Sequence, residues 1–288
     1  MSDYVIVADS ACDIEEEVLQ EWGVSVVKLS YIFTDNEETH PDYELDMKSF
    51  YKMMRDGRVA KTSAANVQQY LDLFGELYRE GKDVLYVGFS TGLSASYGAG
   101  VAAAEQLKKK FPERKCLTVD SFAASAGYGL LVYLTVQKKN EGLSLEENAA
   151  FVTETRDHLC HWFTVDDLVY LKRGGRISAA AAFVAGVLDI KPVLHVDNEG
   201  HLISMAKVRK RKNSIKALAD KYDELALHPE EGPTFICQGD CMEDAEYLAK
   251  LLQERHNVPV DKIVCTGAVI GAHSGPGTLA LFFLGKEK

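Results

Sequence analysis

One histidine near the end of the chain stands in a setting that would aim its side chain. His273 lies in the run Gly271-Ala272-His273-Ser274-Gly275-Pro276-Gly277-Thr278, directly after the apolar residues 263–270. Glycine tolerates positive φ and lets backbone approach a ligand closely, and proline fixes the direction of a turn. A solvated histidine in a tight turn fits this pattern as well as a ligand-binding one. Two other segments of similar character favour the second interpretation.

Hydroxyl groups crowd one of these segments, a loop between a predicted strand and a predicted helix. Ser90, Thr91, Ser94 and Ser96 place four hydroxyls in seven positions. One serine is enough to cap a helix, whereas a helix N-terminus with added hydroxyls binds carboxylate or phosphate. We therefore favour an anion site here over simple capping. The second segment, Lys61-Thr62-Ser63, precedes another predicted helix and in isolation fits plain capping.

Basic residues form two further motifs. Arg173 and Arg176 flank a Gly-Gly pair, and a guanidinium can fork onto a carboxylate or phosphate, although a solvated turn would look the same. Residues 207–212 include five basic side chains in six positions. The chain shows no wider basic face and no interleaved aromatics, so we expect no nucleic acid partner. The patch suits one phosphate group or an acidic partner surface, with a solvated helix start as the alternative.

An enzyme can also be composed from these residues. Ser94 as nucleophile, His273 as base and Asp9 or Asp120 as orienting carboxylate would make a serine-dependent hydrolase or acyl transferase. The sequence lacks a G-x-S-x-G elbow, and no serine of the cluster stands out. It also lacks a Walker A motif and a Rossmann glycine fingerprint. We therefore favour a binding cradle and expect no catalytic residue, metal or cofactor.

Bulk properties narrow the class of protein. The 288 residues suffice for two domains or one large α/β domain, and a net charge of −11 argues against nucleic acid or an anionic membrane as main partner. No apolar run reaches the roughly 20 residues of a membrane helix. Six scattered cysteines without a C-x-x-C pair indicate reduced thiols and a cytoplasmic protein. Residues 158–161, with two histidines and Cys160, are expected to end a helix rather than bind zinc.

The first half of the chain alternates strand and helix patterns. Asp13 is expected to cap the first helix, and Ser144 to open the last one with a capping box. This alternation with apolar strands predicts a mostly parallel sheet covered on both faces. Strands are predicted at 4–8, 24–33, 84–89 and 116–119, and helices at 14–22, 46–55, 66–79, 94–110, 122–140 and 144–161.

The second half has a different texture, beginning with a hairpin at 192–205 around a polar turn. Two α/β domains are therefore expected, residues 1–162 with a mostly parallel sheet and 163–288 with a mixed sheet. An Ala- and Val-rich helix is expected around residues 183–188. Helices are predicted at 213–227 and 243–256, and strands at 234–237, 263–266 and 278–283.

Taken together, these segments resemble the DegV family of bacterial fatty acid-binding proteins. The resemblance runs nearly the whole length and rests on motifs in order: Asp9-Ser10, Thr62-Ser63, Leu93–Tyr97, Tyr170–Ile177, Ile190–Pro192, Lys207–Arg209 and His273–Gly277. It implies two α/β domains, with the ligand between or beneath them, and a non-catalytic carrier. Such a carrier holds a long-chain fatty acid in an apolar tunnel and presents the carboxylate to a separate kinase, which makes the acyl phosphate. The helix around residues 183–188 would line this tunnel or belong to ordinary core.

The resemblance also implies roles for individual residues. In the family pattern the carboxylate is held by side chains that correspond here to Thr62, Ser94, Ser96 and His273. Arg209 would face the kinase or the phosphate. To the ligand-binding candidates we add Ser63 and Arg173 from the motifs above.

The sequence departs from the family pattern at three places: Ala11 replaces a threonine, Ala64-Ala65 replace Gln-Pro, and Ala95 replaces a glycine. The shape of the cradle and the favoured acyl chain are therefore open.

Overall fold

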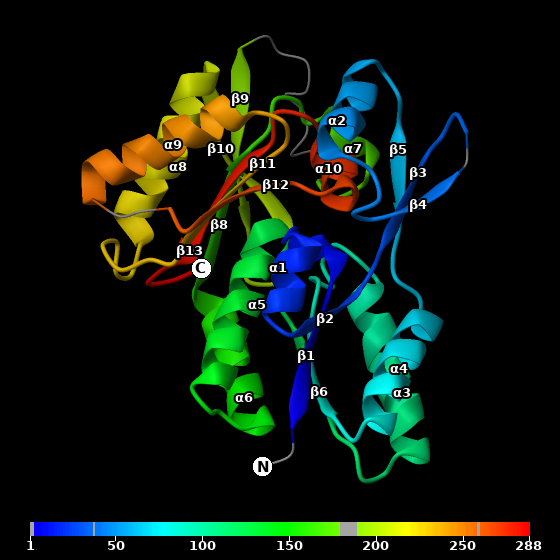
Figure 1. Ribbon diagram of the computed structural model, residues 1–288. Coiled ribbons are helices and arrows are strands. Elements are labelled where there is room, and N and C mark those ends of the chain that lie inside the picture. The colour runs from blue at the N-terminus through cyan, green and yellow to red at the C-terminus, as the bar shows by residue number, and fades with distance from the viewer. Residues whose placement is uncertain (1–2, 37, 179–188, 258–259) are drawn as a thin grey trace.

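A computed structural model describes residues 3–36, 38–178, 189–257 and 260–288 of the chain. It has two α/β units, as predicted (Figure 1). The N-terminal unit is built on a four-stranded sheet in the order β2-β1-β6-β7, in which every neighbouring pair is parallel. Its central strands are almost continuously buried, as expected of a sheet covered on both faces. The strands are β1 (Tyr4–Asp9), β2 (Val24–Val27), β6 (Asp83–Gly88) and β7 (Cys116–Asp120).

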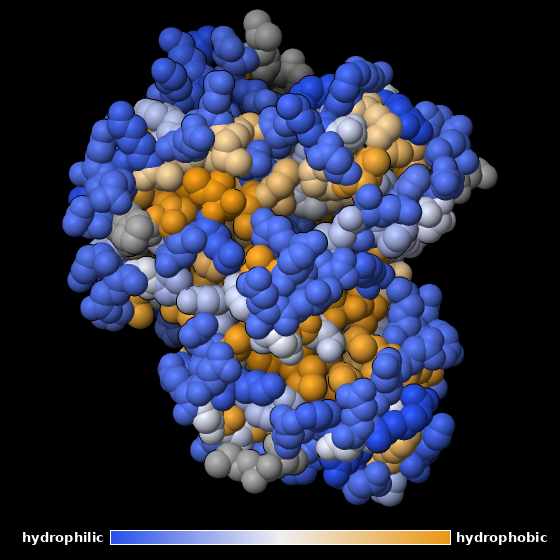
Figure 2. All heavy atoms as spheres, viewed as in Figure 1, coloured by the Kyte–Doolittle hydropathy of each residue, from blue (hydrophilic) through white to orange (hydrophobic). Residues whose placement is uncertain are grey.

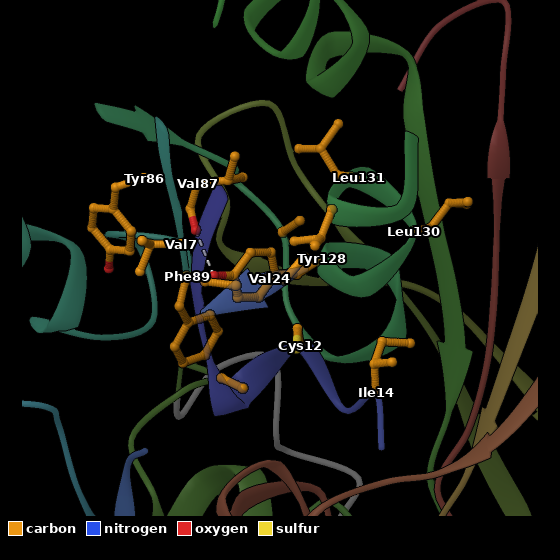
Figure 3. Close-up of a cluster of buried hydrophobic side chains, with 14 of the residues drawn as sticks. Val7, Cys12, Ile14, Val24, Tyr86, Val87, Phe89, Tyr128, Leu130 and Leu131 are labelled. Atoms are coloured by element: carbon orange, nitrogen blue, oxygen red, sulfur yellow. Dashed lines mark hydrogen bonds between the residues drawn. The ribbon is translucent and has the colours of Figure 1, made fainter. Parts of the chain in front are cut away.

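Helices cover this parallel sheet. Capping boxes at Asn66 and Ser144 fix where α3 and α6 begin, because side chain and backbone satisfy each other's donors there. The core between sheet and helices is shown in Figure 3, where the Tyr128 hydroxyl donates to the Val87 carbonyl at 2.6 Å. The helices are α1 (Glu16–Glu21), α3 (Val67–Arg79), α4 (Ser96–Lys110), α5 (Ser125–Asn140) and α6 (Leu145–Thr155).

A small antiparallel sheet, ordered β4-β3-β5, extends from the N-terminal unit toward the C-terminal one. Aromatic side chains of this sheet and of α2, among them Tyr31, Phe50 and Tyr51, pack against Ala268 and Ala272 of α10. This packing brings β5, which carries Thr62, beside α10, which carries His273. The elements are β3 (Ser30–Phe33), β4 (Thr39–Pro41), β5 (Ala60–Ser63), α2 (Met47–Arg55) and α10 (Ala268–Ser274).

The C-terminal unit is a six-stranded mixed sheet in the order β10-β9-β8-β13-β11-β12. Only the β11–β12 pair is parallel among its described strands. The strands are β8 (Leu159–Thr164), β9 (Ile190–Val196), β10 (Leu202–Arg209), β11 (Thr234–Gln238), β12 (Lys262–Cys265) and β13 (Leu279–Leu284).

The two faces of this mixed sheet have different covers. Leu279, Leu281 and Phe283 of β13 belong to the core under α8 (Arg211–Leu225) and α9 (Met242–His256). Side chains alternate along a strand, so Ala280 and Phe282 point to the opposite face, toward α5 and the N-terminal unit. That second face is the one available to a ligand. On the side seen in Figure 2, hydrophobic residues also reach the surface in patches on both units, framed by hydrophilic side chains.

Three local predictions were wrong. Helix α6 ends at Thr155, and Cys160 and His161 lie in strand β8 instead of closing that helix. The six residues of β8 are all buried, and a short apolar run cannot be told from a buried helix by periodicity. Thr62 and Ser63 likewise lie in a strand, β5, and not in a capping turn.

Asp13 does not cap the first helix. It has a left-handed conformation at the end of the short 3-10 helix η1 (Ser10–Cys12), and α1 begins later, after Glu15. Its buried carboxylate instead accepts hydrogen bonds from the Ser125 hydroxyl and from the Gly267 amide. These long-range partners could not be seen in the local sequence.

Most of the other predicted strands and helices are confirmed, with ends that differ by a few residues. The strand predicted at 24–33 is instead divided between β2 and β3, which belong to different sheets. The short elements β4, α7 (Val169–Arg173) and α10 were not predicted. The division at residues 162 and 163 stays a prediction, and strand β8, which spans it, pairs only within the C-terminal sheet. The helix predicted around 183–188 lies outside the described residues. Among the described helices, none has the length and hydropathy that crossing a bilayer would need.

Candidate functional site

A largely apolar pocket lies between the free face of the mixed sheet and the carboxyl ends of the parallel strands. Its empty space is about 830 Å³, including solvent at the mouth. Representative apolar lining residues, drawn from both units, are Leu29, Phe89, Phe163, Val196, Leu202 and Phe282.

His273 and Thr62 meet in the wall of this pocket. Helix α10 presents the imidazole, strand β5 presents the hydroxyl, and His273 Nε2 lies 2.7 Å from Thr62 Oγ1. Burial, with a smaller effect of the Arg176 charge, lowers the pKa of His273 to about 4. The ring is therefore neutral at pH 7. In the tautomer that donates from Nε2 to Thr62, the threonine hydroxyl remains free to donate to an entering carboxylate.

The glycines of the Gly174-Gly175 turn explain how the histidine fits. A Cβ on Gly174 would lie 2.0 Å from His273 Nδ1, so only glycine lets this backbone approach the ring. Gly175 has a φ of +70°, which reverses the chain directly before Arg176. The Gly174-Gly175 pair thus makes room for the imidazole of His273 and also sets the direction of the chain at Arg176.

Of the four hydroxyls in the serine loop, only that of Ser94 belongs to the pocket lining. Ser94 Oγ lies 3.0 Å from Ser96 Oγ and accepts the Ser96 amide at 3.2 Å. Ser96 is fully buried, and its Oγ also accepts the Ala65 amide. Because that acceptor role leaves the Ser96 proton to donate to Ser94, the Ser94 proton can point into the pocket. Ser96 therefore orients Ser94 and lies behind the pocket wall.

The other two hydroxyls of the loop hold protein together. Thr91 donates to the Asp120 carboxylate, and Ser90 donates to the Gly200 carbonyl at 2.9 Å. The expectation of a four-hydroxyl cradle thus resolves into one hydroxyl that faces the ligand space and three that fix its loop.

Arg176, rather than Arg173, brings a guanidinium to the pocket. It is half-buried, donates from Nε to the Leu93 carbonyl at 3.0 Å and from Nη1 to the Gly174 carbonyl at 2.6 Å, and lines the pocket. Arg173 ends α7 (Val169–Arg173), is exposed, and lies over the Tyr170 ring. The sequence analysis saw both arginines but did not single out Arg176. The signal that distinguishes them is the positive-φ glycine immediately before Arg176.

Two further candidates lie away from the pocket lining. Ser63 pairs with Ser30 across the small sheet. Its side chain is exposed, because neighbouring residues of a strand face opposite ways and Thr62 faces the pocket. Arg209 is exposed at the end of β10, within the basic patch. The structure therefore gathers Thr62, Ser94 and His273 and adds Arg176 to them.

The described residues do not form a nucleophile–base–acid triad. Ser94 pairs with Ser96, and His273 pairs with Thr62. Both candidate orienting carboxylates are engaged elsewhere: Asp9 accepts the Phe89 amide, and Asp120 accepts Thr91. Nor do the described residues contain a group of three or more His, Cys, Asp or Glu side chains suited to a metal. All six cysteines are free thiols.

The chain is similar over nearly its whole length to several known proteins. DegV domain-containing protein CPE0026 of Clostridium perfringens is 40% identical over 290 residues, which cover 100% of this chain and 99% of that protein. The crystal structure of DegV, a fatty acid binding protein from Bacillus subtilis, superposes with a TM-score of 0.86 at 27% identity, covering 99% and 100% of the two chains. A stearic acid-binding protein from Eubacterium ventriosum gives a TM-score of 0.86 at 27% identity, covering 98% of each.

A family model described as "Uncharacterised protein, DegV family" matches residues 3–286. With nearly the whole chain matched, and with the two-unit architecture and motif order described above, this chain belongs to the DegV family.

Proposed function

We propose that the protein is a cytoplasmic carrier that binds one long-chain fatty acid in this pocket and presents its carboxylate to a partner kinase. The observation that carries the proposal is the meeting of Thr62, Ser94, His273 and Arg176 in the wall of a largely apolar cavity. The fatty acid-binding relatives from Bacillus subtilis and Eubacterium ventriosum support the choice of ligand.

The energetics of such a ligand fit the residues present. Burying about fourteen methylenes of a sixteen-carbon acid, at roughly 0.8 kcal/mol each, stabilises the complex by at most about 11 kcal/mol. An unpaired buried carboxylate would cancel much of this gain. The Arg176 guanidinium and the Thr62 and Ser94 hydroxyls supply the donors that prevent that loss. His273 stays neutral until the carboxylate arrives.

Native mass spectrometry of protein purified from bacteria tests the ligand. We expect a co-purifying long-chain acid, and binding of added oleate or palmitate to delipidated protein. The Thr62→Val/Ser94→Ala variant should bind about a hundredfold or more weakly, because it loses two hydrogen bonds to a charged group, each worth about 1.5–3 kcal/mol. Thr153→Val, which changes an exposed threonine of α6, serves as control. An empty protein that also refuses both added acids would overturn the proposal.

The kinase step has its own test. Arg209 is exposed and outside the pocket lining, so Arg209→Ala should leave fatty acid affinity unchanged while slowing acyl phosphate formation by a fatty acid kinase. Equal loss of binding and of acyl phosphate formation would contradict the role assigned to Arg209. Unchanged rates with both proteins would place the kinase contact elsewhere on the surface.

A further inference from the structure

The serine loop is held by the C-terminal unit at a point away from the ligand. Ser90 is fully buried and is not part of the pocket lining. Its hydroxyl donates to the carbonyl of Gly200 at 2.9 Å and accepts the Gly92 amide at 3.1 Å. Gly200 stands in the turn between β9 and β10. One hydroxyl therefore joins the loop that carries Ser94 to the tip of a hairpin from the other unit.

The two backbones touch at this point. A Cβ on Gly92 would lie 2.7 Å from the Gly200 carbonyl oxygen, and a Cβ on Gly200 would lie 2.0 Å from Ser90 Oγ. Gly200 also has a φ of +80°, a conformation that other residues rarely adopt. Neither glycine can be replaced without separating hairpin tip and loop.

Both partners of this contact are held by hydrogen bonds within their own segments. The hairpin tip is closed by Asp197, whose carboxylate accepts the amides of Glu199 and His201, each at 2.9 Å. On the loop side, the Ser90 carbonyl accepts the Leu93 amide at 3.1 Å and the Ser94 amide at 3.0 Å. One backbone hydrogen bond thus connects Ser90 directly to Ser94, and a second connects it to the neighbouring Leu93.

We infer that Ser90 is a positioning residue, which acts through Gly200 of the hairpin tip to fix Ser94 against the ligand carboxylate. The inference rests on the proposed function for the identity of the ligand, and it adds a residue that does not touch that ligand. It also gives the hairpin a second task, since Val196 and Leu202 on either side of its tip line the pocket.

The test compares Ser90→Ala with a matched control. Thr135→Val removes an equally buried hydroxyl, which donates to the Leu131 carbonyl at 2.7 Å within α5. Each variant is titrated with palmitate and with hexadecanol, which has the same chain without the carboxylate. For Ser90→Ala we expect the affinity for the acid to fall about tenfold and the affinity for the alcohol to change little. For Thr135→Val the ratio of the two affinities should stay that of the unmodified chain.

Hydrogen exchange supplies a readout that needs no ligand. The Leu93 and Ser94 amides should exchange faster in Ser90→Ala than in Thr135→Val. Gly200→Ala should lower the free energy of unfolding less in the Ser90→Ala variant than in the unmodified chain. In the unmodified chain the new alanine methyl group clashes with Ser90 Oγ, and Ser90→Ala removes that atom. Equal weakening of acid and alcohol, or unchanged exchange at both amides, would overturn the inference while leaving the proposed function intact. Failure of the unmodified chain to bind palmitate would strike the proposed function, and the exchange data would still decide the role of Ser90.

Discussion

Arg173 and Arg176 show how one turn decides which side chain of a motif meets a ligand. The two residues have the same chemistry and stand three positions apart, yet one is exposed over Tyr170 and the other lines the pocket. The difference comes from Gly175, whose positive φ reverses the chain between them. Residue type alone therefore cannot tell which of the two arginines reaches the pocket. The backbone conformation at Gly175 decides it.

The neutral state of His273 leads to a prediction about protons. In the ligand-free protein we expect the imidazole to titrate with a pKa of about 4, because burial and the Arg176 charge disfavour the protonated ring. A carboxylate bound beside the ring favours the imidazolium, so the pKa should rise when a fatty acid binds. NMR titration with palmitate measures the shift, and His273→Gln identifies the resonance. Methyl palmitate, which lacks the charge, is the control; equal shifts with acid and ester would contradict this account.

At the scale of elements, the sequence predicted those helices and strands that are marked by capping or turn residues close to them in the chain. The capping residue Asn66 and the capping box at Ser144 located the starts of α3 and α6, and the turn around residues 197–200 located the hairpin. The strands β5 and β8 were missed because tertiary pairing makes them. The site was predicted in part for the same reason. Hydroxyls and histidine could be selected from motifs. The contact that holds Ser96 behind the pocket wall comes from the distant Ala65 amide, however, and local sequence does not show it.

The close approach of α7 and α10 can be tested with a pair of glycine substitutions. Gly174 has a φ of −73°, which alanine adopts easily, so Gly174→Ala should disturb the site only through its methyl group against His273. We expect the affinity for palmitate to fall about tenfold or more as the ring is displaced. Gly98→Ala, in an exposed turn of α4 with open space around the Cβ, should bind normally and be more stable by up to about 1 kcal/mol. Calorimetric binding and thermal unfolding of both variants measure this, and similar losses in the two would refute the steric explanation.

At the scale of the whole molecule, two buried carboxyl groups lie where its parts join. Asp13 bridges α5 and the start of α10, and Asp42, which follows the small sheet, faces the same helix start. A Cβ on Gly267 would lie 2.7 Å from Asp13 and 3.5 Å from Asp42, so both carboxyls crowd one point. Desolvation raises the pKa of Asp13 well above its usual value and that of Asp42 to about 6. We therefore expect the stability of the junction that carries α10, and with it His273, to depend on pH.

Asp42→Asn tests this dependence. The folded chain holds the Asp42 proton up to a pKa of about 6, whereas the unfolded chain releases it near 3.8. The folded state thus binds more protons in that window, and its stability relative to the variant must fall as pH rises from about 4 to about 6 and level off above. The variant, which binds no proton there, should gain up to about 3 kcal/mol relative to the unmodified chain over this range. Urea unfolding at several pH values measures the difference in unfolding free energy between the two proteins. A pH-independent loss of stability caused by the asparagine side chain would shift this difference by a constant and leave its change with pH unaffected. Asp35→Asn, at an exposed carboxyl whose pKa is lowered by Arg58, should show no such gain between pH 4 and 6. A difference between Asp42→Asn and the unmodified chain that stays constant across pH would show that the carboxyl is ionised in the folded protein throughout.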